Sequence, residues 1–75
     1  MQKGDIYRHY KGKDYRILGI GHHSENLEKV VIYQGLYDDP EFGKEPIWVR
    51  PYHMFVEEIE FEGQFIKRFT KIDRD

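Results

Sequence analysis

Apolar and polar residues alternate in short runs along this chain, and turn-forming residues separate the runs. Stretches rich in Tyr, Ile, Val and Phe recur at short intervals, which is the pattern of an all-β sandwich or barrel. Helical periodicity is absent over any useful length. The pattern therefore predicts one small domain over residues 1–75, built almost entirely from antiparallel strands.

The first three predicted strands occupy the first half of the chain. Asp5–Tyr10 meets Tyr15–Gly21 through a turn that contains Gly12, a residue that adopts positive φ at little cost, so these two runs predict a hairpin. The third run, Leu27–Tyr37, carries apolar residues on both parities. We expect both faces of this third strand to be at least partly covered.

The segment that follows predicts a loop, a short strand and one turn of helix. Residues 38–45 combine proline, glycine and acidic side chains, which resist strand formation, so we expect an exposed and mobile loop. A short strand follows over Pro46–Arg50, and Pro51 ends it because proline has no backbone N–H. Residues 52–55 are predicted to form a single helical turn.

The last predicted hairpin, over Val56–Phe61 and Phe65–Ile72, has the clearest alternation of the chain. On its first strand the apolar residues are expected to face inward and the acidic residues outward, namely Ile59 and Phe61 inward and Glu58, Glu60 and Glu62 outward. Glu57 has the inward parity, so we expect it to be partly buried and paired with Arg50 or Arg68.

Five or six strands with one helical turn before the last hairpin favour a highly curved antiparallel sheet that closes on itself. The predicted fold is thus a small all-β barrel of the SH3-like or Tudor-like kind. An OB-type barrel is the main alternative, but it usually carries a helix between strands, and this sequence shows none.

Composition limits the classes of function. A 75-residue domain buries only about 60–65% of the surface of its unfolded chain, which argues against a deep, enclosed active site. The chain has no cysteine, so it has neither a disulfide framework nor a thiolate metal site, and an intracellular, reducing compartment is expected. With no long apolar run and no signal peptide, we expect a cytoplasmic protein that does not enter the membrane.

The charge distribution leaves nucleic-acid binding open as an alternative function. The formal net charge of −2 argues against a protein held to nucleic acid by its overall charge. Basic residues nevertheless cluster at the two ends of the chain: Lys3, Arg8, Lys11, Lys13 and Arg16 early, and Lys67, Arg68, Lys71 and Arg74 late. If the terminal strands lie together, they create a basic face on which single-stranded RNA or DNA could stack against Tyr7, Tyr10 or Tyr15.

The segment His22-His23-Ser24-Glu25 raises a second alternative, a small metal-dependent enzyme. Its candidate ligands are His22, His23 and His53. Adjacent histidines on a strand point to opposite faces and cannot readily hold one ion, and Ser24 lacks the glycine-flanked turn of a hydrolase nucleophile. We therefore assign no catalytic residue, no metal ligand and no cofactor.

The stretch from Trp48 to Phe55 is the most informative for function. Alternation places Trp48 and Arg50 on one face of their strand and Ile47 and Val49 on the other. If the aliphatic pair is core, the tryptophan and arginine are at least partly exposed. The competing interpretation is that Trp48 covers the mouth of the barrel while Arg50 forms a local salt bridge.

Trp, Tyr and Arg together are typical of binding hot spots, because they combine large contact area with directional hydrogen bonds. We therefore expect a non-enzymatic binding module that recognises a peptide or a small polar ligand. The predicted ligand-binding residues are Tyr33, Tyr37, Trp48, Arg50, Tyr52 and His53. An exposed edge strand could pair two copies, so the expected state is a monomer or a weak homodimer.

Several segments together resemble a known family. They are Tyr7-Arg8-His9-Tyr10-Lys11-Gly12, His23-Ser24-Glu25, Val31-Ile32-Tyr33-Gln34-Gly35-Leu36-Tyr37, Trp48-Val49-Arg50-Pro51, Met54-Phe55 and Arg68-Phe69. The chain is similar over nearly its whole length to the short bacterial proteins of the family "domain of unknown function sixteen fifty-three". Members of that family often have Thr where this chain has Asn26. The resemblance implies a bacterial source and a stand-alone domain, and it supplies no established activity and no catalytic residues.

Overall fold

The computed structural model describes residues 1–73, which form nine strands and one short helix. The elements are β1 (Ile6–His9), β2 (Asp14–His22), β3 (Lys29–Gly35), β4 (Asp38–Asp39), β5 (Gly43–Lys44), β6 (Ile47–Pro51), α1 (Tyr52–Phe55), β7 (Glu58–Phe61), β8 (Gln64–Lys67) and β9 (Phe69–Ile72). The prediction of an all-β protein with one helical turn is confirmed.

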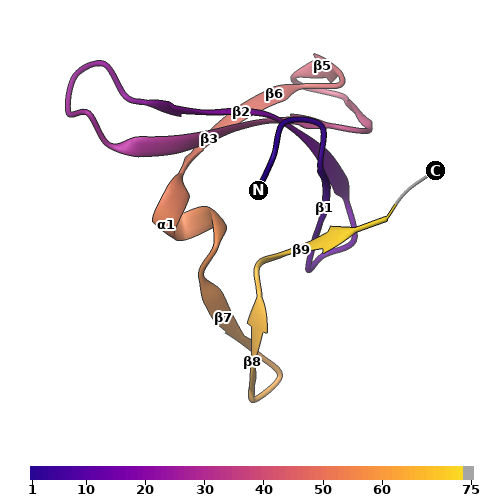
Figure 1. The fold of residues 1–75 in the computed structure, drawn as a ribbon. Coiled ribbons are helices and arrows are strands. Elements are labelled where there is room, and N and C mark those ends of the chain that lie inside the picture. Colours follow the sequence, from indigo (N-terminus) through magenta and orange to yellow (C-terminus); the bar gives the residue numbers. More distant parts are fainter. Residues whose placement is uncertain (74–75) are drawn as a thin grey trace.

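Five strands form the main antiparallel sheet, in the order β6-β3-β2-β1-β9 (Figure 1). The predicted hairpin between β1 and β2 is present, and Gly12 has the expected positive φ of 105°. The last strand crosses to the N-terminal one, so that Ile6 lies opposite Ile72 and His9 opposite Phe69. The two ends of the chain are therefore neighbours in the sheet.

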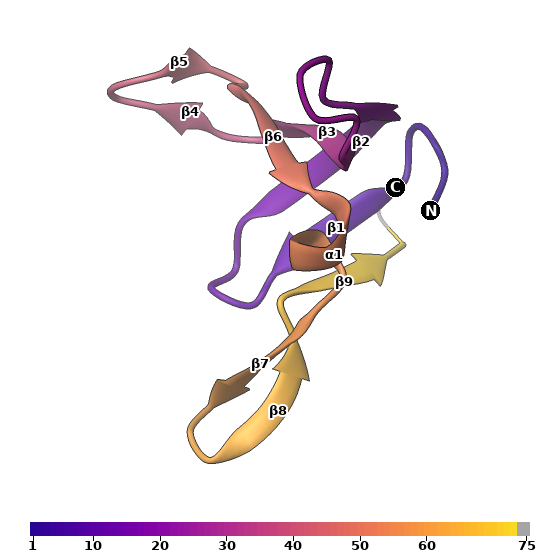
Figure 2. The same cartoon turned by 90° about the vertical axis from the view of Figure 1, so that its left-hand side faces the viewer.

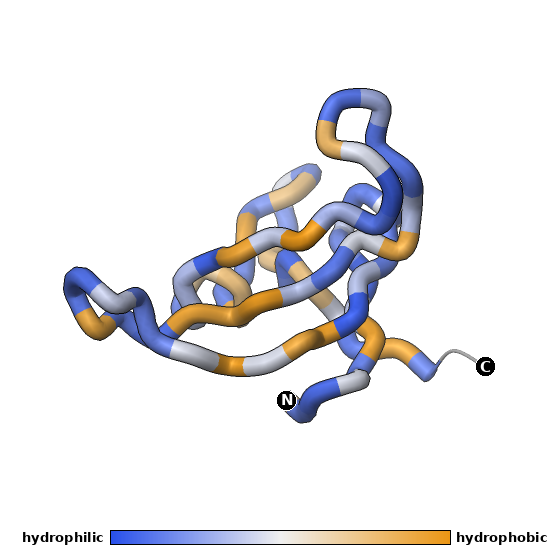
Figure 3. Tube along the Cα trace, turned by 90° about the horizontal axis from the view of Figure 1, so that it is seen from above, coloured by the Kyte–Doolittle hydropathy of each residue, from blue (hydrophilic) through white to orange (hydrophobic). Residues whose placement is uncertain are grey.

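The core lies on one face of this sheet and is largely aromatic. Residues two apart on a strand share a face, and in the described part of the chain Ile17, Val31, Tyr33, Phe55 and Phe69 form the buried cluster. Figure 3 shows apolar and polar positions alternating along the strands. Phe55 comes from α1 and stacks on Phe69 with ring centroids 4.0 Å apart. The single helical turn thus places one ring in the centre of the core.

The predicted closure into a barrel is wrong. Strands β6 and β9 are the two edges of the five-stranded sheet, and β7 and β8 form a separate two-stranded sheet. The side chain of Phe55, which is 1% exposed, packs against the rings of Tyr33 and Phe69 on one face of the sheet.

The β7–β8 hairpin projects away from the main sheet (Figure 2). Its turn forms at Glu62 and Gly63, which both have positive φ, as a tight two-residue hairpin turn requires. The radius of gyration is 12.9 Å, above the roughly 11 Å expected for a compact domain of this length. The projecting segments account for the larger value.

This projection corrects one part of the predicted burial pattern. The acidic residues of β7 and its turn are exposed as expected, and Ile59 is half-buried. Phe61, however, is 44% exposed and packs edge-to-face against Tyr10. The side chain of Phe61 points to the predicted inward side of its strand but contacts the ring of Tyr10 rather than the core, because the hairpin extends beyond the main sheet.

The segment 38–45 also differs from the prediction, because it contains two short paired strands. Asp38 lies opposite Lys44 and Asp39 opposite Gly43. The carboxylate of Asp39 accepts hydrogen bonds from the amides of Glu41 and Phe42, which organises the turn. These amide donors lower the pKa of Asp39 below its ordinary value.

The predicted alternation along β6 is present, and the aliphatic pair faces outward rather than into the core. Ile47 and Val49 are 61% and 62% exposed, whereas Trp48 packs against the core cluster. Trp48 lies opposite Tyr33, so these two residues share a face of the sheet. The larger aromatic ring takes the core side because it removes more apolar area from water than an aliphatic side chain does.

Within residues 1–73, no helix is long and apolar enough to cross a membrane.

Candidate functional site

The side chain of Tyr37 is the centre of a hydrogen-bonded aromatic group. Its hydroxyl accepts a bond from the indole Nε1 of Trp48 at 3.2 Å and lies 3.1 Å from the hydroxyl of Tyr15. The Tyr37 ring lies where a Cβ on Gly35 would otherwise be, since that atom would come within 2.6 Å of a ring carbon. The glycine at the end of β3 therefore makes room for the ring.

Arg50 extends this group along β6. Its Nε donates to the hydroxyl of Tyr33 at 3.2 Å, and its guanidinium lies 5.6 Å from the centre of the Phe69 ring. Among residues 1–73 no carboxylate lies within ion-pair distance of Arg50. The half-buried arginine is thus held by aromatic side chains alone. We call Tyr15, Tyr33, Tyr37, Trp48 and Arg50 the aromatic–arginine face.

The Tyr15 hydroxyl of this face has a raised pKa. Burial, together with the hydrogen bond to Tyr37, raises the pKa of Tyr15 well above its ordinary value, so its hydroxyl keeps its proton at neutral pH. The ammonium of Lys13 lies 4.2 Å from the centre of the Tyr37 ring, in a cation–π contact. The face therefore combines the protonated hydroxyl of Tyr15 with a cation over the Tyr37 ring.

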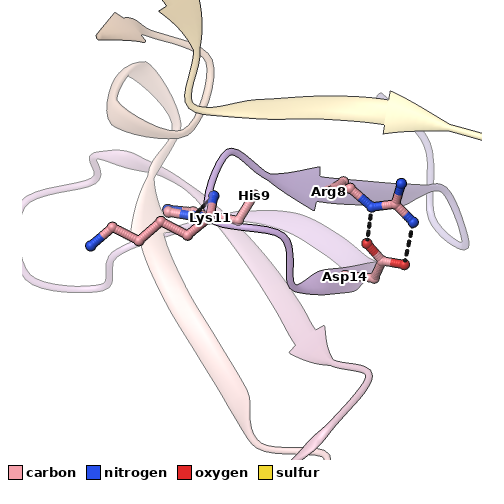
Figure 4. A network of polar contacts seen from close by, with 4 residues as sticks. All are labelled: Arg8, His9, Lys11 and Asp14. Carbon is pink, nitrogen blue, oxygen red and sulfur yellow. Dashed lines mark hydrogen bonds and ion pairs between the residues drawn. The ribbon is translucent and has the colours of Figure 1, made fainter. Parts of the chain in front are cut away.

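His9 lies at the edge of the same aromatic core. Its ring centre is 5.0 Å from that of Phe69, and its Nδ1 accepts the backbone N–H of Lys11 at 3.1 Å. Burial, followed by the charges of Arg50, Arg68 and Lys11, lowers the pKa of His9 below its ordinary value. Figure 4 shows the Lys11 side chain extending away from the ring.

The structure separates the six predicted binding residues into two groups. Tyr33, Tyr37, Trp48 and Arg50 come together on the aromatic–arginine face. Tyr52 and His53 lie at the other end of β3, where the ammonium of Lys29 is 4.0 Å from the centre of the Tyr52 ring and His53 Nδ1 is 3.5 Å from Glu28 Oε1. The predicted surface is therefore not one continuous site.

The structure adds Tyr15 to this surface and places Lys13 and His9 beside it, and the sequence did not assign these three residues to it. The sequence predicts Tyr15 only as a stacking platform for bases. Its inward position follows from the parity it shares with Ile17, which is fully buried. Lys13 and His9 depend on the register of the β1–β2 hairpin, which hydrophobic alternation does not determine.

The histidines do not form a metal centre. Among residues 1–73 no group of three or more His, Cys, Asp or Glu side chains has the arrangement of a metal site. His22 and His23 are exposed at the far end of the β2–β3 hairpin, and His23 Nδ1 accepts the backbone N–H of Glu25 at 3.1 Å. A metal-dependent enzyme would need His22, His23 and His53 close enough to hold one ion. The structure does not bring these three side chains together.

The two basic ends of the chain do meet, and three of their cations are paired with carboxylates. Arg8 makes a two-bond contact with Asp14, with Nε to Oδ1 at 2.7 Å (Figure 4). The Nζ atom of Lys71 lies 3.8 Å from Oδ1 of Asp5. The predicted partner of Glu57 is confirmed, because Arg68 Nη2 donates to its Oε1 at 2.6 Å. Within residues 1–73, the other cations of the two ends form no ion pair: Lys3, Lys11, Lys13, Arg16 and Lys67.

Two cavities lie apart from the aromatic–arginine face. One, of about 160 Å³, is lined by Met1, Tyr7, Tyr52, Phe55, Val56, Lys67 and Phe69. The other, of about 330 Å³, is lined by Arg8, His9, Tyr10, Gly12, Ile66, Lys67, Thr70 and Ile72. Neither cavity is lined by a pair of acidic residues, so neither has the two carboxylates of a general acid–base site.

The fold and these side chains define a small all-β domain with a hydrogen-bonded aromatic and arginine surface. Residues 5–71 match the family model described as "Protein of unknown function (DUF1653)", and the chain belongs to this family. It is similar to the crystal structure of a DUF1653 protein from Bordetella bronchiseptica, with 30% sequence identity and a TM-score of 0.82 over 96% of this chain and 87% of that one. A search of curated proteins finds no match.

Proposed function

We propose that this domain is a non-enzymatic binding module whose aromatic–arginine face takes a peptide or a small polar ligand. The observation that carries the proposal is Arg50, a half-buried cation held by Tyr33 and Phe69 with no carboxylate partner among residues 1–73. Burying a charge without an opposite charge is costly. A ligand that supplies the missing partner would recover that cost.

The geometry favours a binding role over a purely structural one. If Arg50 only fixed the local fold, an acidic neighbour would satisfy its guanidinium, as Glu57 does for Arg68. Trp48 keeps part of its surface accessible and is ordered by its bond to Tyr37. Ordered aromatic side chains lose little conformational freedom on binding, which is why they dominate binding hot spots.

The proposal is tested by titrating ¹⁵N-labelled protein with a peptide library and a set of small polar metabolites. We expect a ligand to shift the signals of Tyr37, Trp48 and Arg50 together and to change the fluorescence of Trp48, the only tryptophan. The Tyr37→Phe variant removes the central hydroxyl and should weaken binding, whereas Tyr10→Phe, outside the face, should not. Shifts confined to other parts of the sheet would refute the proposal.

RNA or single-stranded DNA binding has less support. Counterion release needs several uncompensated cations, and three of the basic residues at the paired chain ends, Arg8, Arg68 and Lys71, already have acidic partners. Tyr7 and Tyr15 also pack against the core cluster, which limits the ring area open to a base.

The absence of cysteine and a bacterial family relative support localisation in the bacterial cytoplasm, where we propose that the domain is a monomer or a weak homodimer.

A further inference from the structure

The aromatic–arginine face presents hydrogen-bond donors and few acceptors. Trp48 Nε1–H already donates to the Tyr37 oxygen, and a single O–H forms the bond between Tyr37 and Tyr15. Two hydroxyls have two protons, so one of them has no acceptor within the face. The hydrogen-bond inventory therefore leaves one tyrosine O–H available, whichever of the two rings donates.

Arg50 and Tyr33 add further donors of the same kind. Tyr33 uses its oxygen to accept from Arg50 Nε, which leaves the Tyr33 O–H without an acceptor in the face. The two NH₂ groups of Arg50 have no carboxylate partner among residues 1–73, and guanidinium groups only donate. The Arg50 NH₂ groups and the free tyrosine O–H groups are donors that need an acceptor, and no carboxylate among residues 1–73 supplies one to Arg50.

The surroundings of the face are positive rather than negative. The ammonium of Lys13 lies over the Tyr37 ring, and the guanidinium of Arg50 lies over the Phe69 ring. The carboxylate of Asp39 is within reach of the charge of Lys13, but it already accepts two backbone amides of its own turn.

We infer that the ligand of this face binds through a carboxylate group, which Arg50 receives with the free tyrosine hydroxyls beside it. The inference rests on the proposed binding function and specifies its ligand. A planar carboxylate has two oxygens that accept paired donors from a guanidinium, and such charge-assisted bonds are the strongest in proteins. A single carboxylate suits one unpaired arginine better than a polyanion does, because a polyanion requires many cations.

The test compares carboxylate ligands with matched amides. One arm uses N-acetylated tripeptides with a free C-terminal carboxylate and the same peptides as C-terminal amides. A second arm uses succinate and succinamide, which distinguishes a small organic acid from a peptide end. Binding is followed through Trp48 fluorescence and through the Trp48 Nε1–H and Arg50 Nε–H signals in NMR spectra.

We expect at least one carboxylate ligand to bind about tenfold or more tightly than its amide. Arg50→Gln should abolish this difference, and Arg50→Lys should restore only part of it because lysine cannot make the paired contact. Arg16→Gln is the matched control: Arg16 is exposed and lies next to Tyr15 in β2, so it has the opposite parity. This control should bind as the unmodified protein does.

The outcomes separate the two proposals. Ligands that bind at the face with equal affinity as acid and amide would overturn the carboxylate inference and leave the binding function standing. Binding only of short single-stranded RNA, with steep salt dependence, would overturn the carboxylate inference in favour of nucleic acid. If no ligand perturbs Trp48 or Arg50, both proposals are wrong. Thermal melting of each variant checks that lost binding is not lost folding.

Discussion

Replacing Phe55 by alanine should remove much of the stability of this domain. The α1 helix is four residues long and has no side-chain cap hydrogen bond, and isolated helices of this length are not stable in water. Its attachment depends on Phe55, which is 1% exposed and contacts the rings of Tyr7, Tyr33 and Phe69. The substitution therefore leaves a cavity at the centre of the core.

The expected loss follows from comparable substitutions. Truncating a buried phenylalanine to alanine costs about 3–5 kcal/mol of unfolding free energy. A protein of 75 residues has a total stability of about 4–11 kcal/mol at typical values per residue. Phe55→Ala should therefore lose from about a quarter to all of this stability, whereas Phe55→Leu keeps much of the apolar area and should lose less.

Urea denaturation followed by far-UV circular dichroism measures these differences. Met54→Ala is the matched control, because Met54 lies in the same helical turn but is 37% exposed, and it should cost less than about 1 kcal/mol. Our account of the core would be refuted if Phe55→Ala cost no more than the control. Phe55→Leu keeps the comparison measurable if the alanine variant does not fold.

Three further predictions concern the rest of the domain. Glu57→Gln removes the charge that pairs with Arg68 and should cost about 1–2 kcal/mol in urea titrations, and an unchanged midpoint would contradict a role for this pair. The pKa of His9 is lowered in the folded state, so the unfolded chain takes up a proton at this residue more readily than the folded chain does. The free energy of unfolding should therefore decline as the pH falls from about 6.5 toward the folded pKa of His9. In His9→Gln, the unfolding free energy should depend less on pH between pH 5 and 7. In Gly35→Ala the new Cβ would lie 2.6 Å from a ring carbon of Tyr37, so we expect the free energy of unfolding to fall by about 1–3 kcal/mol and the tryptophan fluorescence to change. The control is Gly19→Ala, whose new Cβ meets nothing within 4 Å. It should leave the stability and the fluorescence nearly unchanged.

Local signals in the sequence predicted the local structure well. Gly12 and Gly63 have positive φ in hairpin turns, and Pro51 immediately precedes the helical turn. The parity of Glu57 correctly indicated a partly buried carboxylate paired with Arg68. These features depend on a few neighbouring residues, so the alternation pattern contains enough information to place them.

The errors concern arrangements that depend on distant contacts. Both parities of β6 carry large apolar side chains, and only the pairing with β3 decides that Trp48 shares the face of Tyr33. Barrel closure depended on whether the edge strands β6 and β9 pair with each other, which the alternation within each strand does not determine. For the same reason, the residue types predicted four members of the candidate site but not Tyr15, nor Lys13 and His9 at its margins.

The pairing of β1 with β9 has a consequence for how the chain reaches this structure. The partners Ile6 and Ile72 are at nearly opposite ends of the sequence, so their contact closes a loop of almost the whole chain. The chain loses the entropy of closing this long loop before the stabilising contacts between β1 and β9 can form. Proteins with such long-range pairing fold in milliseconds to seconds. On the ribosome, β1 can pair with β2 as soon as both emerge, but its second edge stays unpaired until residues 69–72 have left the exit tunnel. Completion of the sheet therefore waits for the last strand of the domain.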